Sequence, residues 1–135
     1  MGETIGHIKV TSLDGLRWAE LDAVVDTGAT MTVLPMGKAA ALGIAADRVM
    51  EVELGDGRIV QRGVAHAWIE WGGRRSINPV LIGEGTDACV IGVVTLETLG
   101  LGVDPVKRGL FFLPAIHHYR AAGIQRGLAV ERSSS

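Results

Sequence analysis

Apolar and polar residues alternate in short stretches along most of this chain, and glycine-containing turns separate the stretches. Alternation with a period of two is typical of a β-strand with one buried face. Paired stretches around a turn predict three hairpins, with their turns at residues 12–15, 55–57 and 72–73. Their arms are residues 5–10 and 16–25, 49–54 and 58–64, and 65–71 and 76–82. Strands at this spacing predict a small barrel or sandwich.

Two segments break the strand pattern and predict short helices. Pro35 is suited to open a helix through residues 39–42, and Gly43 to end it in a left-handed conformation. Residues 95–99 form the second, in which Thr95 is expected to be the N-cap and Gly100 the stop. Both helices are brief, so the strands are expected to dominate the fold.

The chain is expected to contain one domain. A turn at 103–105 leads into a closing strand over residues 110–113, and Pro114 stops that strand. We therefore assign residues 1–113 to the domain. Residues 114–135 form a C-terminal extension, which is expected to be partly helical around 116–122 or frayed.

Composition agrees with an all-β fold of small size. The chain has 135 residues, 47% of them hydrophobic, which is enough for one modest core. Glycine accounts for 19 residues, against a usual frequency of about 7%. Such a glycine content favours many tight turns between short strands over long helices.

Charge and cysteine content exclude several classes of protein. Thirteen basic and fifteen acidic residues give a net charge of −2, without the basic block expected of a nucleic-acid-binding protein. The single Cys89 allows no disulfide framework or multi-thiolate metal site, which suits a reducing compartment. No apolar run approaches the roughly 18 residues of a membrane span, and no signal sequence is recognisable. We expect a soluble, cytoplasmic protein without nucleic-acid or membrane partners.

The strongest chemical signal is Asp26-Thr27-Gly28, which follows the apolar residues 23–25 and precedes a second apolar run. A carboxylate in a glycine turn between two hydrophobic strands is expected to be buried enough for its proton affinity to change, yet reachable from one side. This arrangement suggests water activation by paired aspartates. The alternative is an ordinary Asx-type turn, closed by the aspartate's own side chain.

The order of three features resembles the retroviral-like aspartic proteases: Asp26-Thr27-Gly28-Ala29, the glycine-tipped hairpin at 55–57, and Val90-Ile91-Gly92 before a short helix. The resemblance covers residues 5–113 and is closest to small prokaryotic single-lobe members. It implies a small closed β-barrel of the acid-protease (retropepsin) type, working as a homodimer with one catalytic aspartate per subunit. It implies neither a cofactor nor a metal ion.

The resemblance also assigns roles to the residues around the aspartate. Asp26 is implied as the catalytic residue, Thr27 as a hydrogen-bonding partner across the dimer axis, and Gly28 as a point of close backbone approach to substrate. Ala29 and Thr30 are implied to line the substrate groove. Further roles fall to a mobile flap at Gly55, Asp56 and Gly57, and to a structural support beneath the loop at Val90, Ile91 and Gly92. For Asp56, a tight β-turn is an equally good explanation.

The mechanism implied by the resemblance needs two aspartates, and the chain contains no second Asp-Thr-Gly or Asp-Ser-Gly. The second carboxylate is therefore expected from a second chain, across a two-fold axis. One departure concerns a structural ion pair of the viral members, between an acidic residue and an arginine. Here those two positions hold Thr30 and Val93, so both charges are missing together.

Two functions follow from the sequence. The first is an aspartic endopeptidase that hydrolyses peptide bonds in flexible protein segments. The second is a catalytically silent homodimer that binds peptides or partner proteins through the same groove.

Other reactive residues receive structural explanations. His117-His118 are expected at the surface and not as metal ligands, and Cys89 is expected to be a buried apolar residue. Trp68 and Trp71 lie on opposite faces of one predicted strand, so at most one belongs to the core. Arg74-Arg75 are expected at a solvated hairpin tip.

Overall fold

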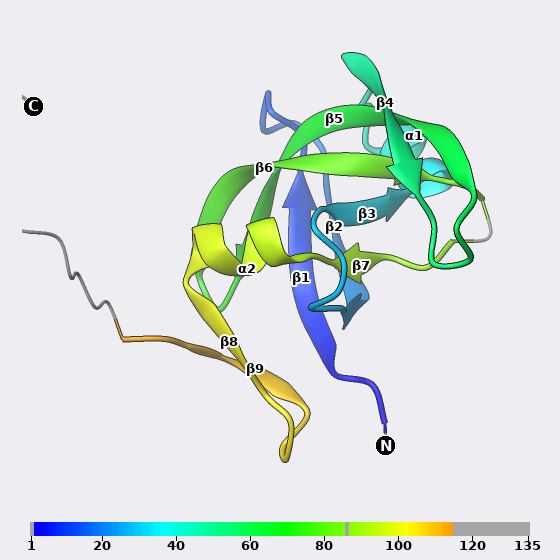
Figure 1. Ribbon diagram of the computed structural model, residues 1–135. Coiled ribbons are helices and arrows are strands. Elements are labelled where there is room, and N and C mark those ends of the chain that lie inside the picture. The colour runs from blue at the N-terminus through cyan, green and yellow to red at the C-terminus, as the bar shows by residue number, and fades with distance from the viewer. Residues whose placement is uncertain (1, 86, 115–135) are drawn as a thin grey trace, which may run out of the picture.

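The computed structural model describes residues 2–85 and 87–114 (Figure 1). The predicted helix at 116–122 and His117-His118 lie outside the described residues. The strands are β1 Ile5–Thr11, β2 Trp18–Val25, β3 Thr32–Pro35, β4 Arg48–Glu53, β5 Ile59–Trp71, β6 Arg74–Gly83, β7 Val90–Ile91, β8 Leu101–Asp104 and β9 Gly109–Phe112. The helices are α1 Met36–Ala41 and α2 Val93–Leu99.

Seven strands form one sheet in the order β1-β2-β7-β3-β6-β5-β4, and β1 also pairs with β5. Six of the strands therefore form a ring, and β4 extends from the outer edge of β5 (Figure 1). Alternating residues of the ring strands point inward and form the core, including Ile8, Val10, Ala67, Ile69 and Ile91, all at most 1% exposed. The expected all-β fold with two short helices is confirmed.

The second and third predicted hairpins share a single strand. β5 runs for 13 residues without a break, pairing with β4 over its first half and with β6 over its second. The prediction of separate arms at 58–64 and 65–71 was wrong because no turn residue separates Val64 from Ala65, and both are fully buried. One long strand thus links the predicted flap to the core of the ring.

The helix α2 begins two residues earlier than predicted. Its N-cap is Gly92, without a side-chain cap, so the assignment of Thr95 as N-cap was wrong. The Thr95 side chain is 1% exposed and bonds instead to Thr32, which is far away in sequence. The predicted stops are confirmed, because Gly43 and Gly100 have φ of 68° and 67°.

The C-terminal part of the domain forms a separate two-stranded sheet. β8 was not predicted, and β9 pairs with β8 instead of with the ring. One face of this sheet packs on the core through Val103 and Leu110. The β8–β9 hairpin lies on the same side of the molecule as the N-terminus (Figure 1).

Arg74 and Arg75 are both exposed, as predicted for a solvated tip, and Arg74 has a further role. Its guanidinium donates to the Leu99 carbonyl at the end of α2 (2.8 Å) and stacks on Phe112 (4.1 Å). Trp71 packs against the core and against Phe112, whereas Trp68 stacks with Arg75. Arg74 is therefore a helix-capping residue that ties β6, α2 and β9 together.

No helix in the described part of the chain is long and apolar enough to cross a membrane.

Candidate active site

Asp26 is positioned by two neighbouring parallel strands. β2 and β7 run side by side, with Val25 opposite Ile91, and the Asp26 N–H donates to the Ile91 carbonyl at 3.0 Å. β2 ends at Val25, so the chain turns away from the sheet at Asp26. The sheet thereby fixes the backbone from which the carboxylate projects.

The Asp26 carboxylate has one fixed oxygen. Its Oδ1 accepts the Gly28 N–H at 2.8 Å, which is the Asx-type turn expected as the alternative. Within residues 2–85 and 87–114, Oδ2 accepts no hydrogen bond from the protein. The turn therefore orients the carboxylate and leaves one oxygen available for a substrate or water.

Asp26 is exposed in the single chain, contrary to the expected burial. The reason is its place at the end of β2, where the loop over residues 26–31 leaves the ring. Thr27 and Gly28 are exposed as well. A Cβ atom on Gly28 would lie 3.2 Å from Asp26 Oδ1, so a side chain there would press on the carboxylate.

The loop after Asp26 rests on the start of α2. The Val93 N–H donates to the Ala29 carbonyl (2.8 Å), and the Val94 N–H to the Thr30 carbonyl (2.9 Å). Between them, Gly92 touches the loop so closely that a Cβ atom would lie 2.5 Å from the Met31 carbonyl carbon. Gly92 is thus required by close backbone approach, as the predicted support beneath the loop implies.

The remaining two members of the predicted support belong to β7. Ile91 is 1% exposed within the core, and Val90 pairs with both Val24 and Val33. β7 is only two residues long, yet it bridges β2 and β3, the strands on either side of the Asp26 loop. These residues brace the loop and have no chemical groups of their own to contribute.

A groove of about 790 Å³ lies between the Asp26 loop and the β4–β5 hairpin. The loop contributes three of the predicted residues beside Asp26, namely Gly28, Ala29 and Thr30. From the hairpin side, Gly55 is the one predicted flap residue that reaches the groove. Its other lining residues are Met31, Val33, Met50, Glu51, Val52, Glu53, Leu54 and Leu81. Sequence reasoning missed these, although the alternation of Met50, Val52 and Leu54 marks one face of a strand.

The tip of the β4–β5 hairpin is a closed turn. The Gly57 N–H donates to the Leu54 carbonyl (2.9 Å), with Gly57 at φ 88°. Asp56 accepts the Arg58 N–H (3.0 Å) and Nε–H (2.7 Å), and these bonds lower the pKa of its carboxyl. Asp56 therefore stabilises a tight β-turn, which was the alternative explanation for this residue. It does not line the groove.

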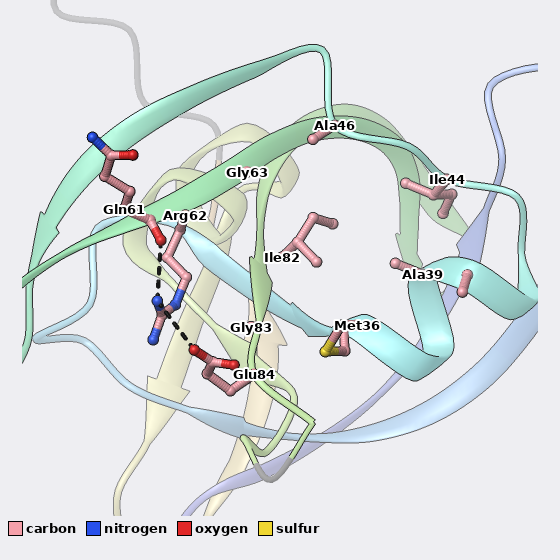
Figure 2. Close-up of a pocket in the computed structure, with 11 residues that line it drawn as sticks. Met36, Ala39, Ile44, Ala46, Gln61, Arg62, Gly63, Ile82, Gly83 and Glu84 are labelled. Carbon is pink, nitrogen blue, oxygen red and sulfur yellow. Dashed lines mark hydrogen bonds and ion pairs between the residues drawn. The ribbon is translucent and has the colours of Figure 1, made fainter.

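A second cavity, of about 390 Å³, lies between α1 and the facing parts of β5 and β6 (Figure 2). Its walls are mainly apolar, and at one end Arg62 approaches Glu84 at 3.5 Å. None of the residues that line it also lines the groove beside Asp26. The candidate active site is therefore the groove and not this cavity.

Other potential reactive groups offer no competing site in the described part of the chain. Burial raises the pKa of the Cys89 thiol to about 11, so the thiol stays protonated, and its predicted burial is confirmed. No group of three His, Cys, Asp or Glu side chains is arranged to hold a metal ion within residues 2–85 and 87–114.

Comparison with known proteins identifies the family. A family model described as aspartyl protease matches residues 9–95, which include the Asp26 loop, the β4–β5 hairpin and the start of α2. The chain belongs to the aspartyl protease family. No curated protein sequence matches it significantly.

Two viral proteases with solved structures show the fold of this aspartyl protease. EIAV protease, solved in complex with the inhibitor HBY-793, superposes with a TM-score of 0.57 at 20% identity, covering 73% of this chain and 89% of that one. The solution structure of simian foamy virus (mac) protease superposes with a TM-score of 0.50 at 19% identity, covering 70% of this chain and 93% of that one. The protein is thus retropepsin-like in fold, as the resemblance implied.

Proposed function

We propose that this retropepsin-like protein is an aspartic endopeptidase that cleaves flexible protein segments with a water molecule activated by two Asp26 carboxylates in a homodimer. The observation that carries the proposal is the position and hydrogen bonding of the Asp26 carboxylate. Its carboxylate lies on the wall of a peptide-sized groove, is oriented through Oδ1 and has Oδ2 available.

The chemistry explains why two copies are needed. Two carboxylates about 3 Å apart share one proton, because both cannot be ionised at that distance. The ionised carboxylate takes a proton from water, whose oxygen attacks the peptide carbonyl carbon. The protonated carboxyl gives its proton to the carbonyl oxygen. When the tetrahedral intermediate collapses, the C–N bond breaks, the amine nitrogen takes a proton from the dyad, and one hydroxyl of the intermediate returns its proton to the dyad, which restores the shared proton.

The proposed substrate is an extended peptide in the groove. Its main chain would lie between the loop at Ala29 and Thr30 and the hairpin tip at Gly55, both of which reach the groove. The groove is lined by apolar side chains, such as Met31 and Met50, which suit apolar substrate residues, and also by Glu51 and Glu53. Folded proteins do not present such an extended segment, so flexible segments are the expected targets.

A surface for the second copy is available at the β8–β9 sheet. Phe111 and Leu113 both lie over Gly102, on the face opposite the core-packed Val103 and Leu110. Phe111 is 43% exposed and Leu113 48%. Because the other face of this sheet already packs on the core, its exposed apolar face is the one that would favour pairing with a second copy.

Leu113→Asp is expected to raise the dimer dissociation constant about 100-fold, because a charge would be buried at the interface. Ile77→Asp is the matched control, since Ile77 is equally exposed at 48% but lies on the outer face of β6. Sedimentation velocity across a dilution series measures both constants. An equal change in the two variants, or none in Leu113→Asp, contradicts the proposed interface.

The alternative function, a catalytically silent homodimer that binds peptides, can be distinguished from a protease by its affinity for a peptide that mimics the tetrahedral intermediate. A protease binds a peptide with a hydroxyl-bearing carbon in place of the scissile carbonyl far more tightly than the parent peptide. We therefore expect cleavage of a denatured protein between pH 4 and 7, with inhibition by the hydroxyl peptide. Absence of cleavage, together with equal affinity for both peptides, would establish the binding function instead.

A further inference from the structure

We propose that the buried hydroxyl groups of Thr32 and Thr95 are positioning residues for Asp26, an inference that rests on the proposed function. The two Oγ1 atoms lie 2.6 Å apart although 63 positions separate the residues. Thr32 is 2% exposed and Thr95 1%, so neither hydroxyl can exchange this partner for bulk water. Thr32 Oγ1 also accepts the N–H of Gly92 at 3.1 Å.

The pair stands where the Asp26 loop ends. Thr32 is the first residue of β3, immediately after the loop, and Thr95 is the third residue of α2, whose N-cap is Gly92. The loop start is fixed by the bond from the Asp26 N–H to Ile91, and its middle by the N–H groups of Val93 and Val94. The residues that hold the loop all lie within residues 91–95. The bond between Thr95 and Thr32 holds the end of the loop.

The pair also joins the two segments that lack the ion pair of the viral members. Thr30 and Val93 carry no charge. At these positions the Asp26 loop and the start of α2 are joined by main-chain hydrogen bonds. An ion pair between a carboxylate and an arginine is lost once the pH falls through the carboxyl pKa, which the arginine lowers. Two hydroxyls do not titrate in that range, so this connection keeps its geometry at the acidic pH that favours a shared-proton dyad.

Position matters here because the loop carries the reacting group. A misplacement of about 1 Å can cost a factor of about 100 in rate, even when it originates away from the chemistry. The hydroxyl pair is buried below the loop and does not line the groove. Its loss should therefore lower kcat more than it raises KM.

Thr98, one turn further along α2, provides a control on the same helix, at an exposed position. Its single hydroxyl hydrogen is shared between Asn78 Oδ1 (3.0 Å) and the Thr95 carbonyl oxygen (3.1 Å), so it holds the helix to β6 and not to the loop. Asn78 is fully buried. Thr98→Val therefore removes a hydroxyl from an exposed position on the same helix without touching the Asp26 loop.

The experiment compares Thr95→Val, Thr95→Ser and Thr98→Val in the full chain, with kcat and KM measured on one peptide. Thr95→Val keeps the side-chain shape and is expected to lower kcat at least about tenfold, with KM within about twofold. Thr95→Ser retains the hydroxyl and should stay within about threefold of the unmodified protein, as should Thr98→Val. Equal kcat in Thr95→Val and Thr98→Val, or a serine variant as slow as the valine variant, overturns the inference.

Amide hydrogen exchange supplies a readout that does not need activity. In Thr95→Val, the N–H groups of Asp26, Ala29, Val93 and Val94 should exchange at least about tenfold faster than in Thr98→Val. Equal exchange in the two variants overturns the positioning role. A protein without peptidase activity would contradict the proposed function alone, and the exchange rates would still decide the role of Thr95.

Discussion

Replacing Asp26 by asparagine is expected to reduce kcat/KM about 1,000-fold or more while leaving the fold and the dimer intact. The amide is close in size to the carboxyl, and its oxygen can still accept the Gly28 N–H that now bonds to Oδ1. The turn should therefore persist. A neutral amide, however, cannot take a proton from water, so the general base of the reaction is lost.

Stability should change little in this variant. Asp26 is exposed in the single chain, and substitutions at exposed positions usually alter the free energy of unfolding by less than about 0.5 kcal/mol. In a dimer, the amide N–H of one introduced asparagine can donate to the amide oxygen of the other in place of the shared proton of the dyad, so association should be no weaker. Steady-state hydrolysis of a peptide from pH 4 to 7, with sedimentation of the same samples, measures both effects.

Asp56→Asn is the control for the loss of a charge. Asp56 is also exposed and also accepts a backbone N–H two residues later, but it lies in the hairpin tip outside the groove. We expect its kcat/KM to remain within about threefold of the unmodified protein. If Asp26→Asn retains activity comparable to Asp56→Asn, Asp26 is not the catalytic residue.

Gly92→Ala should have the second largest effect. An alanine Cβ would lie 2.5 Å from the Met31 carbonyl carbon, 2.6 Å from its oxygen and 2.8 Å from the Thr30 oxygen. All three are backbone atoms, so no side-chain rotation relieves the contact, and the loop must move away from α2. We expect a loss of about 1–3 kcal/mol in the free energy of unfolding and about 100-fold in kcat.

Gly37→Ala separates this steric effect from a general cost of losing glycine. Gly37 lies in α1, and a Cβ atom there would meet no atom within 4 Å. Alanine in a helix should be neutral or stabilising by up to about 1 kcal/mol. Thermal unfolding and peptide hydrolysis are compared for both variants, and an active, stable Gly92→Ala would show that the loop does not depend on contact with Gly92.

Features that depend on local sequence were predictable. The Asp26 turn, the glycine stops at Gly43 and Gly100 and the glycine-tipped hairpin each follow from a few adjacent residues. Gly92 was recognised through its motif, although only the structure gives the reason, which is its contact with the Met31 backbone.

Features that depend on distant partners were not predictable. Thr95 satisfies the pattern of an N-cap, and nothing near it in sequence indicates that Thr32 is its partner. β8 was missed because Val103-Asp104-Pro105 suggests a turn until the pairing with β9 is known. The burial expected for Asp26 assumed that strands on both sides enclose it, whereas the turn lies at the surface of the single chain.

The central claim is that two Asp26 side chains from different chains form one site, and subunit mixing tests it most directly. Unmodified protein is unfolded and refolded together with a ninefold excess of Asp26→Asn, and peptide hydrolysis is expressed per unmodified chain. If the site needs both carboxylates, random pairing leaves about one tenth of the original activity, since only dimers of two unmodified chains work. Activity per unmodified chain that is unchanged by the excess would show that each Asp26 acts alone and would contradict the account.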